Sequence, residues 1–417
     1  MSVVRSLIEA NRLGARKGLP CFCTANEHVL RAVLDQTAAT GLPTVIEATC
    51  NQVNQDGGYT GLAPRQFKAW LDELATDAGV PMDQIILGGD HLGPNPWRAR
   101  PVDEAMDKAG EMVRLYAEAG FTKIHLDASM ACGGEPDPSF EQIANRAADL
   151  CAVAEAHAPD PGKLIYVIGT EVPIPGGEID EPDALDVTSV ERFHQTISTH
   201  QEAWNARGLN GAWERIVSVV TQPGVDFGHT SVYPFKPEKA QPLAQSIAEH
   251  SGLTFEAHST DYQSDDALSA LVDAHFFFLK VGPELTFRFR EAVWALARLA
   301  AESEQPPKRD VRAVVMDAMQ KTPQHWRDYY RGNAREVETL KVFSYSDRIR
   351  YYWSDATVAE ALDELMSLLE AQRIAETEIS QAFMGLAFGA LTSDPTELIK
   401  RHIQTSVRRY FQAAGHG

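Results

Sequence analysis

Three short polar motifs in this chain follow apolar segments and carry side chains that can bind a metal. They are Gly89-Asp90-His91, Gly228-His229-Thr230 and Ala257-His258-Ser259. A parallel barrel gathers the carboxyl ends of its strands around one mouth, where histidines far apart in sequence can meet. Three imidazoles with a nearby carboxylate form a typical divalent-metal site, which suits zinc best and also accepts nickel, manganese, cobalt or iron. The pattern therefore favours an enzyme over a binding module.

Other segment ends add candidate acid, base and cation positions. Asp127 is either a second acid/base or a group that orients a ligand histidine. Glu171 precedes Gly176-Gly177-Glu178, and Lys280 ends the last apolar segment. One such residue alone is usually a hydrogen-bonded scaffold group, but several that converge on one barrel mouth indicate catalysis. His125 lies inside its segment and is more typical of the barrel interior than of a ligand.

Side chains suited to a sugar follow two of the segments. Amides come after the second segment and hydroxyls after the seventh: Asn51, Gln52, Asn54, Ser259 and Thr260. Amides offer the donors and acceptors that sugar hydroxyls require, although here they could instead only shape a loop. The two hydroxyls could bind phosphate oxygens. Glu47, near the end of the second segment, either contacts substrate hydroxyls or makes a hydrogen bond inside the barrel.

The elements that position these residues are eight short apolar segments. They are Pro20–Ala25, Pro43–Thr49, Gln84–Gly89, Lys123–Asp127, Lys163–Gly169, Ile216–Val220, Leu253–Ala257 and His275–Val281. None alternates strictly between polar and apolar residues, as expected for strands that are covered on both faces. Helical patterns such as Val102–Ala119 and Pro138–Ala158 separate them. The alternation predicts a (β/α)8 TIM barrel over residues 1–301, closed by a helix at Pro283–Ala301.

The remaining chain, residues 302–417, predicts a helical C-terminal extension packed on the barrel. Residues 302–310 resemble an exposed linker, and the rest has helical periodicity without a convincing strand. Ser344–Trp353 places aromatic residues around Arg348 and Arg350. These arginines either belong to a packed helix or reach over the barrel mouth to hold a phosphate or a neighbouring subunit.

Composition excludes several classes of partner. The net charge of -20 disfavours nucleic acid and anionic membranes, and no apolar run is long enough to span a bilayer. The five cysteines show no paired zinc-ribbon spacing, which predicts a reduced, cytoplasmic protein. Barrels of this kind often form homo-oligomers, but the sequence shows no specific interface pattern. A phosphorylated small substrate stays compatible with the acidic composition.

Longer motifs resemble a known family over nearly the whole chain. They are Ile46-Glu47-Ala48-Thr49, Asn51-Gln52-Val53-Asn54-Gln55, Gly57-Gly58-Tyr59-Thr60-Gly61, Leu87-Gly88-Gly89-Asp90-His91-Leu92-Gly93-Pro94-Asn95, Lys123-Ile124-His125-Leu126-Asp127-Ala128-Ser129-Met130 and Gly169-Thr170-Glu171-Val172-Pro173. These strings resemble the GatZ/KbaZ family, the subunits associated with tagatose-bisphosphate aldolase. That family is itself similar to class II aldolases, which are metal-dependent barrels.

The resemblance to class II aldolases implies roles for individual residues. The aldolase ligands correspond to His91, His229 and His258. Asp90 corresponds to the general acid/base, and Glu171 belongs to an acidic loop beside the metal. The stretch Lys280-Val281-Gly282 corresponds to a strand end that helps to hold substrate phosphate. The chain departs from the aldolases at Ser259-Thr260-Asp261, where they have a glycine-rich segment, which argues against a second phosphate site and against bisphosphate cleavage.

Three functions compete at this stage. The resemblance favours a metal-dependent 4-epimerase that converts tagatose 6-phosphate to fructose 6-phosphate by retro-aldol and aldol steps, with Asp90 as base. The alternative is a non-catalytic subunit that stabilises a class II tagatose-bisphosphate aldolase. Tagatose-6-phosphate kinase, a label common in the family, is rejected because the chain has no phosphate-binding Gly-x-x-x-x-Gly-Lys-Ser/Thr loop. A Schiff-base aldolase that uses Lys280, Lys163 or Lys123 is a minor alternative.

Overall fold

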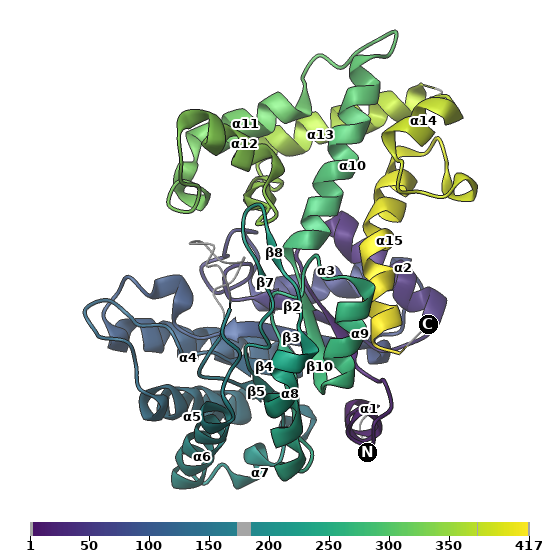
Figure 1. Cartoon of the computed structure of the whole chain (residues 1–417). Helices are drawn as coiled ribbons and strands as arrows, with labels where there is room; N and C mark the ends of the chain where they lie inside the picture. The colour runs from purple at the N-terminus through teal and green to yellow at the C-terminus, as the bar shows by residue number, and fades with distance from the viewer. Residues whose placement is uncertain (1–2, 173–184, 373, 416–417) are drawn as a thin grey trace.

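Eight parallel strands close into a barrel at the centre of the molecule (Figure 1). The computed structural model describes residues 3–172, 185–372 and 374–415. Around the barrel the strands follow the order β1-β10-β9-β6-β5-β4-β3-β2. They are β1 Leu19–Cys23, β2 Thr44–Thr49, β3 Ile85–Leu92, β4 Lys123–Leu126, β5 Ile165–Ile168, β6 Ile216–Val220, β9 Thr254–Ala257 and β10 Phe276–Val281. Each lies in or overlaps one predicted segment, so the predicted (β/α)8 barrel is confirmed.

The strands are buried on both faces because helices cover the outside and side chains fill the inside. All residues of β6 and β10 are buried, which explains why these segments lack polar alternation. Charged residues inside such strands have nowhere to point except the barrel interior or its mouth. Lys123 in β4 and Glu256 in β9 are both fully buried. A fully buried charge requires a partner, so these positions mark a polar centre.

The described part of the chain contains fifteen α-helices, which lie around the barrel or over one of its ends. They are α1 Val3–Arg12, α2 Glu27–Thr40, α3 Pro64–Asp77, α4 Val102–Glu118, α5 Phe140–His157, α6 Val190–Ala206, α7 Asn210–Trp213, α8 Pro237–Ser246, α9 Asp265–Asp273, α10 Pro283–Ala301, α11 Val311–Lys321, α12 Ala334–Phe343, α13 Ala356–Ala371, α14 Glu376–Ala382 and α15 Pro395–Ala413. Side-chain caps begin several of them: Ser139 accepts from Gln142 N at the start of α5. A short antiparallel hairpin, β7 Asp226–Phe227 and β8 Val232–Tyr233, follows β6.

The helix that closes the barrel layer is α15, and the expectation for Pro283–Ala301 is corrected. Helix α10 begins after β10, contacts α2 and rises away from the barrel to pack against α13, α14 and α15 (Figure 1). Helix α15 packs more extensively against α2, and it also packs against α9 and contacts β1. Its Phe411 stacks on Phe22 of β1 at a centroid distance of 5.9 Å. The end of the chain therefore completes the core that the start of the chain begins.

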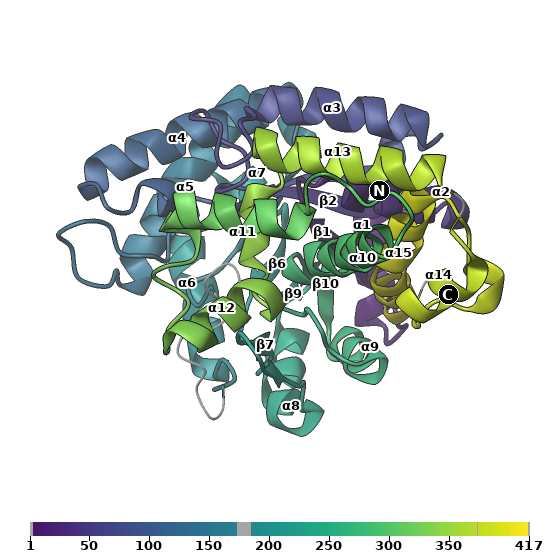
Figure 2. The ribbon, with the colours of Figure 1, turned by 90° about the horizontal axis from the view of Figure 1, so that it is seen from above.

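The rest of the C-terminal region covers one end of the barrel. Viewed from above, α11, α12 and α13 lie over the barrel end from which α10 rises (Figure 2). None of residues 302–372 and 374–415 lies in a strand, as the sequence predicts. One continuous apolar cluster joins barrel residues such as Phe22 to Leu365 of α13 and Ile403 of α15. No helix in the described residues has both the length and the apolar character needed to cross a membrane.

Candidate active site

A cavity of about 460 Å³ opens at the carboxyl ends of the strands. This volume lies within the range of about 300–1,000 Å³ that is typical of small-molecule sites. Residues predicted as site residues from the sequence line it: Asn51, Gln52, Asp90, His91, His258, Ser259, Lys280 and Gly282. The position agrees with the general placement of chemistry in TIM barrels.

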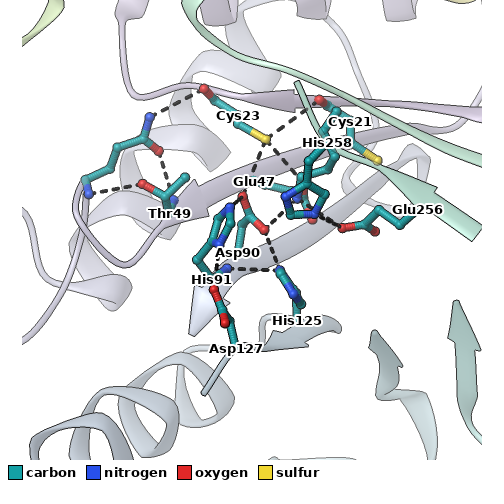
Figure 3. A network of polar contacts seen from close by, with 12 residues as sticks. Cys21, Cys23, Glu47, Thr49, Asp90, His91, His125, Asp127, Glu256 and His258 are labelled. Carbon is teal, nitrogen blue, oxygen red and sulfur yellow. Dashed lines mark hydrogen bonds and ion pairs between the residues drawn. The ribbon is translucent and has the colours of Figure 1, made fainter. Parts of the chain in front are cut away.

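Three histidine rings meet beneath this cavity, and they come from β3, β4 and the end of β9. The ring centroids of His91 and His258 are 4.8 Å apart, those of His91 and His125 are 5.1 Å apart, and those of His125 and His258 are 5.2 Å apart. Figure 3 shows the three rings around the carboxylate of Asp90. The sequence predicts three converging histidines, and the third of them in the structure is His125.

His229 does not lie in this group, which corrects its expected place among the ligands. It sits in the turn between β7 and β8, and its Nδ1 lies 3.0 Å from the hydroxyl of Ser346. Its Nε2 lies 3.1 Å from the carbonyl oxygen of Tyr329. The hairpin after β6 carries this ring toward the C-terminal region, so His229 helps to attach that region to the barrel.

Asp127 holds the ring of His91. Its Oδ2 lies 2.8 Å from His91 Nδ1, and its Oδ1 accepts the hydroxyl of Ser129 at 2.6 Å. Burial by itself raises the pKa of Asp127. The hydrogen bond to His91 and the positive charge of His91 outweigh burial, so the pKa of this carboxyl lies below its usual range. The pKa of His91 is raised: burial opposes its charge, and Asp90 and Asp127 overcome that effect. This arrangement fits the ligand-orienting alternative for Asp127.

Asp90 is the most highly connected carboxylate of the site. Its Oδ1 lies 2.8 Å from His125 Nδ1 and 2.7 Å from Lys280 Nζ, and its Oδ2 lies 3.7 Å from His91 Nε2. Burial by itself raises the pKa of Asp90, but the charges of His91 and Lys280 lower it well below the usual value. Asp90 is therefore ionised at neutral pH, in the protonation state of a proton acceptor.

Two lysines and two glutamates form the charged floor below the histidines. Lys123 Nζ lies 2.7 Å from Glu47 and 2.6 Å from Glu256. Lys280 pairs with Glu47 and also lies 3.4 Å from Glu256. Glu47 thus serves in ion pairs inside the barrel. A side chain at Gly88 would place its Cβ 2.7 Å from Glu47, so only glycine leaves room there.

Sequence reasoning missed Glu256 and Cys23 and underrated His125. Glu256 Oε1 lies 3.0 Å from His258 Nε2, and Cys23 donates its thiol to Glu47 and Asp90 at 3.4 and 3.8 Å. The sequence carried a usable pattern, because alternate residues of a strand share a face. Glu256 and His258 are two residues apart, as are His125 and Asp127.

The other predicted positions have different environments. Glu171 pairs with Arg192 of α6 at 2.7 Å, while Gly176-Gly177-Glu178 lie outside the described residues. Thr260 is fully buried and donates its hydroxyl to the carbonyl of Lys280 at 2.7 Å, away from the cavity lining. Asn54 donates to Cys50 O and accepts from Gly58 N, so it shapes the loop.

The backbone has an unusual conformation at the carboxyl ends of two strands that carry site residues, β3 and β9. His91 has φ 51° and Ser259 has φ 52°, in the left-handed region that non-glycine residues rarely adopt. Such strain persists only where the surroundings enforce it, and it concentrates at functional sites. Close packing also fixes the loop after β3: a Cβ at Gly93 would lie 1.6 Å from the carbonyl oxygen of Asp127.

The cluster has the donor types and spacing for a divalent cation. Ligand atoms of Asp90, His125, Glu256 and His258 all lie within 4.8 Å of one another, and all four residues are buried. His125 Nε2 has no hydrogen-bond partner among the described residues. Burial lowers the pKa of His258 to about 3, so its imidazole is neutral, which is the metal-binding form. Imidazole and carboxylate donors suit zinc and similar transition metals.

These features define a (β/α)8-barrel protein whose strand ends carry a buried, metal-capable polar centre beside a small-molecule cavity. A family model described as "D-tagatose-1,6-bisphosphate aldolase subunit GatZ/KbaZ-like" matches residues 4–415. The chain belongs to this GatZ/KbaZ-like family.

Individual relatives carry different names. A protein of Escherichia coli O9:H4 named "D-tagatose-1,6-bisphosphate aldolase subunit GatZ" is 43% identical over 98% of this chain and 99% of its own. A protein of Agrobacterium fabrum named "D-tagatose 6-phosphate 4-epimerase" is 41% identical over 100% of this chain and 99% of its own. A solved structure from Sinorhizobium meliloti 1021, titled a probable tagatose 6 phosphate kinase, is 42% identical, has a TM-score of 0.88 and covers 95% of this chain and 100% of its own.

Proposed function

We propose that this chain is a metal-dependent 4-epimerase of tagatose 6-phosphate or a closely related ketose phosphate. The observation that carries the proposal is the group of buried carboxylate and imidazole side chains directly below a cavity of substrate size. The full-length likeness to the Agrobacterium epimerase supports the same reaction. Tagatose and fructose differ only at C4, so inversion at that carbon interconverts their 6-phosphates.

The cation would be held by His125, Glu256 and His258, and His91, whose ring centroid lies 4.8 Å from that of His258, would be a fourth ligand. When bound, it would supply a Lewis acid to the carbonyl end of the ketose. Asp127 supports this assignment for His91, because a carboxylate on the other ring nitrogen fixes the direction of a ligand histidine. The resemblance to class II aldolases implies His229 as a ligand, and our proposal assigns His125 in its place.

Asp90 would accept the proton of the C4 hydroxyl and so start cleavage of the bond between C3 and C4. Its position in the cavity wall and its ionised state support this role. Lys280, 2.7 Å away, holds the carboxylate in place. After cleavage, the aldehyde fragment turns within the cavity, the bond re-forms on the opposite face, and Asp90 returns the proton. Direct removal of the C4 hydrogen is harder, because C4 is not adjacent to the carbonyl carbon.

A second candidate function is that of a partner subunit for a tagatose-bisphosphate aldolase. The relative named as such a subunit is similar over almost its entire length, which is the observation that favours this role. The polar centre argues against it as the sole role, because a purely structural subunit has no need for an intact metal-capable ligand set beside a cavity of substrate size.

The test is conversion of tagatose 6-phosphate by the purified chain in D₂O, without a partner. We expect fructose 6-phosphate that retains its C4 hydrogen, because cleavage of the C3–C4 bond does not exchange it. Asp90→Asn should abolish the conversion, whereas the surface variant Asp160→Asn should not. Deuterium at C4 would refute the bond-cleavage route. Absence of turnover with added zinc, nickel or manganese, together with activation of an aldolase partner, would establish the subunit role.

A further inference from the structure

The segment Ser344–Trp353 of the C-terminal region contributes to the wall of the active-site cavity. It contains the short 3₁₀ helix η6, Arg348–Tyr352. Arg350 and Tyr351 line the same cavity as His91 and Lys280. The catalytic roles proposed above use no residue of this segment. Its presence in the wall therefore needs its own explanation.

Buried polar contacts fix this segment to the barrel. The carboxylate of Asp347 is fully buried, pairs with Arg290 of α10 at 2.9 Å and accepts the hydroxyl of Thr286 at 2.6 Å. Tyr345 N donates to the carbonyl of His229 at 2.8 Å. These contacts hold the start of η6 in one place, so the side chain of Arg350 projects from a rigid support.

The guanidinium of Arg350 makes hydrogen bonds only to neutral groups in the part of the chain that the structure describes. Its Nη1 donates to the carbonyl oxygens of Ser346 and Asp347, and its Nη2 lies 3.0 Å from the hydroxyl of Tyr351. The nearby carboxylate of Asp347 is already paired with Arg290. A partly buried guanidinium without a carboxylate partner has charge available for an anionic ligand.

Lys280, which also lines the described part of the cavity wall, has no such capacity. Its ammonium pairs with Glu47 and Asp90 and lies 3.4 Å from Glu256. Three carboxylates around one ammonium leave no net positive charge for a substrate anion. Among the lysines and arginines of the described cavity wall, Lys280 therefore belongs to a carboxylate-rich floor, whereas Arg350 on η6 has no carboxylate partner.

Aromatic rings keep the guanidinium in this position. Arg350 lies over the ring of Tyr351, 4.5 Å from its centroid. Tyr351 in turn packs edge-on against Tyr59, whose loop follows β2, with ring centroids 4.6 Å apart. Both tyrosines line the cavity. Stacking of this kind restricts the planar guanidinium without consuming its donors.

We propose that Arg350 binds the phosphate monoester of the ketose, at the end of the substrate remote from the metal-capable centre. This inference rests on the proposed function, which supplies a substrate with one phosphate. The C-terminal region then completes the active site instead of only covering the barrel. Free inorganic phosphate shares the relevant chemistry and should bind to the same guanidinium.

The first test measures inorganic phosphate binding to the full-length protein by calorimetry. Arg350→Met should weaken binding by roughly 10- to 100-fold, the usual effect of losing charge-assisted hydrogen bonds. Arg350→Lys should fall between, because lysine keeps the charge but not the two-pronged geometry. The exposed Arg298, which pairs with Glu302 on the surface, provides the matched control Arg298→Met, for which no change is expected. Phosphate binding by Arg350→Met equal to wild type would overturn the proposal.

The second test separates this inference from the proposed function. With tagatose 6-phosphate, Arg350→Met should raise KM by the same factor, with kcat changed much less; with unphosphorylated tagatose, KM should not change. If wild type is active and the KM of Arg350→Met is unchanged, the role of Arg350 is refuted, whereas the proposed epimerase function is not. If wild type is inactive but still binds phosphate through Arg350, the proposed epimerase function is refuted, whereas phosphate binding by Arg350 is not. If Arg350→Met does not fold, the KM of Arg350→Lys for tagatose 6-phosphate is compared with that of wild type. An unchanged KM in Arg350→Lys then overturns the proposal.

Discussion

Replacing Glu256 with glutamine tests the charged floor of the barrel. Glu256 is fully buried, lies 2.6 Å from Lys123 and bonds to His258, and these charges outweigh burial to keep its pKa well below normal. Breaking a buried ion pair costs about 3–5 kcal/mol, and we expect about 3 kcal/mol because Lys123 keeps Glu47 as a partner. With an unfolding entropy of about 2.1 cal/mol/K per residue, this lowers Tm by about 3 °C.

The assay is calorimetric melting of metal-stripped protein, followed by melting with added zinc. Glu256→Gln should melt lower than wild type without metal, and added zinc should raise its Tm less, because the proposed ligand set has lost a carboxylate. Glu202→Gln on the exposed face of α6 is the matched control and should melt as wild type does. A Glu256→Gln variant with wild-type Tm in both conditions would refute the reasoning.

Two further variants probe the site and the core. Asp127→Asn should weaken zinc binding by about 10- to 100-fold, because it removes the group that orients His91. Competition with a chelator measures the affinity, and the surface variant Asp160→Asn should bind zinc as wild type does. Equal zinc affinities of Asp127→Asn and Asp160→Asn would contradict this role of Asp127. Burial lowers the pKa of His200 from 6.5 to about 4, so its folded form binds fewer protons, and the stability present above pH 6.5 is lost as pH falls toward 4. Between pH 7 and 4.5, His200→Gln should lose roughly 2.5 kcal/mol less free energy of unfolding than wild type, as measured by denaturant unfolding. The exposed-histidine variant His157→Gln is the control and should lose as much as wild type. If His200→Gln loses as much as His157→Gln, the prediction is wrong.

The strands could be predicted from the sequence because local composition determines them. A run such as Phe276–Val281 has only one polar residue, Lys280, and is too short for a long helix, so a strand covered on both faces is the remaining solution. The residues at the strand ends then followed from barrel geometry, which placed Asp90, His91 and His258 at one mouth. Strand alternation, if applied to the interior, would also have included His125 and Glu256.

Long-range packing could not be predicted in the same way. Spacing alone does not reveal that the β7–β8 hairpin turns His229 toward Ser346, because a loop direction depends on what it packs against. The place of α15 in the helical layer depends on contacts such as Phe411 with Phe22, which join the two ends of the chain. The same applies to Arg350, whose role in the cavity wall requires the fixed position of η6.

The metal content of three purified proteins tests the central claim most directly. Wild type, His125→Ala and His229→Ala should be measured by mass spectrometry after dialysis against zinc, and each assayed with tagatose 6-phosphate. The account predicts about one bound metal and turnover in wild type, loss of both in His125→Ala, and a retained metal in His229→Ala. A metal retained by His125→Ala and lost from His229→Ala would contradict it.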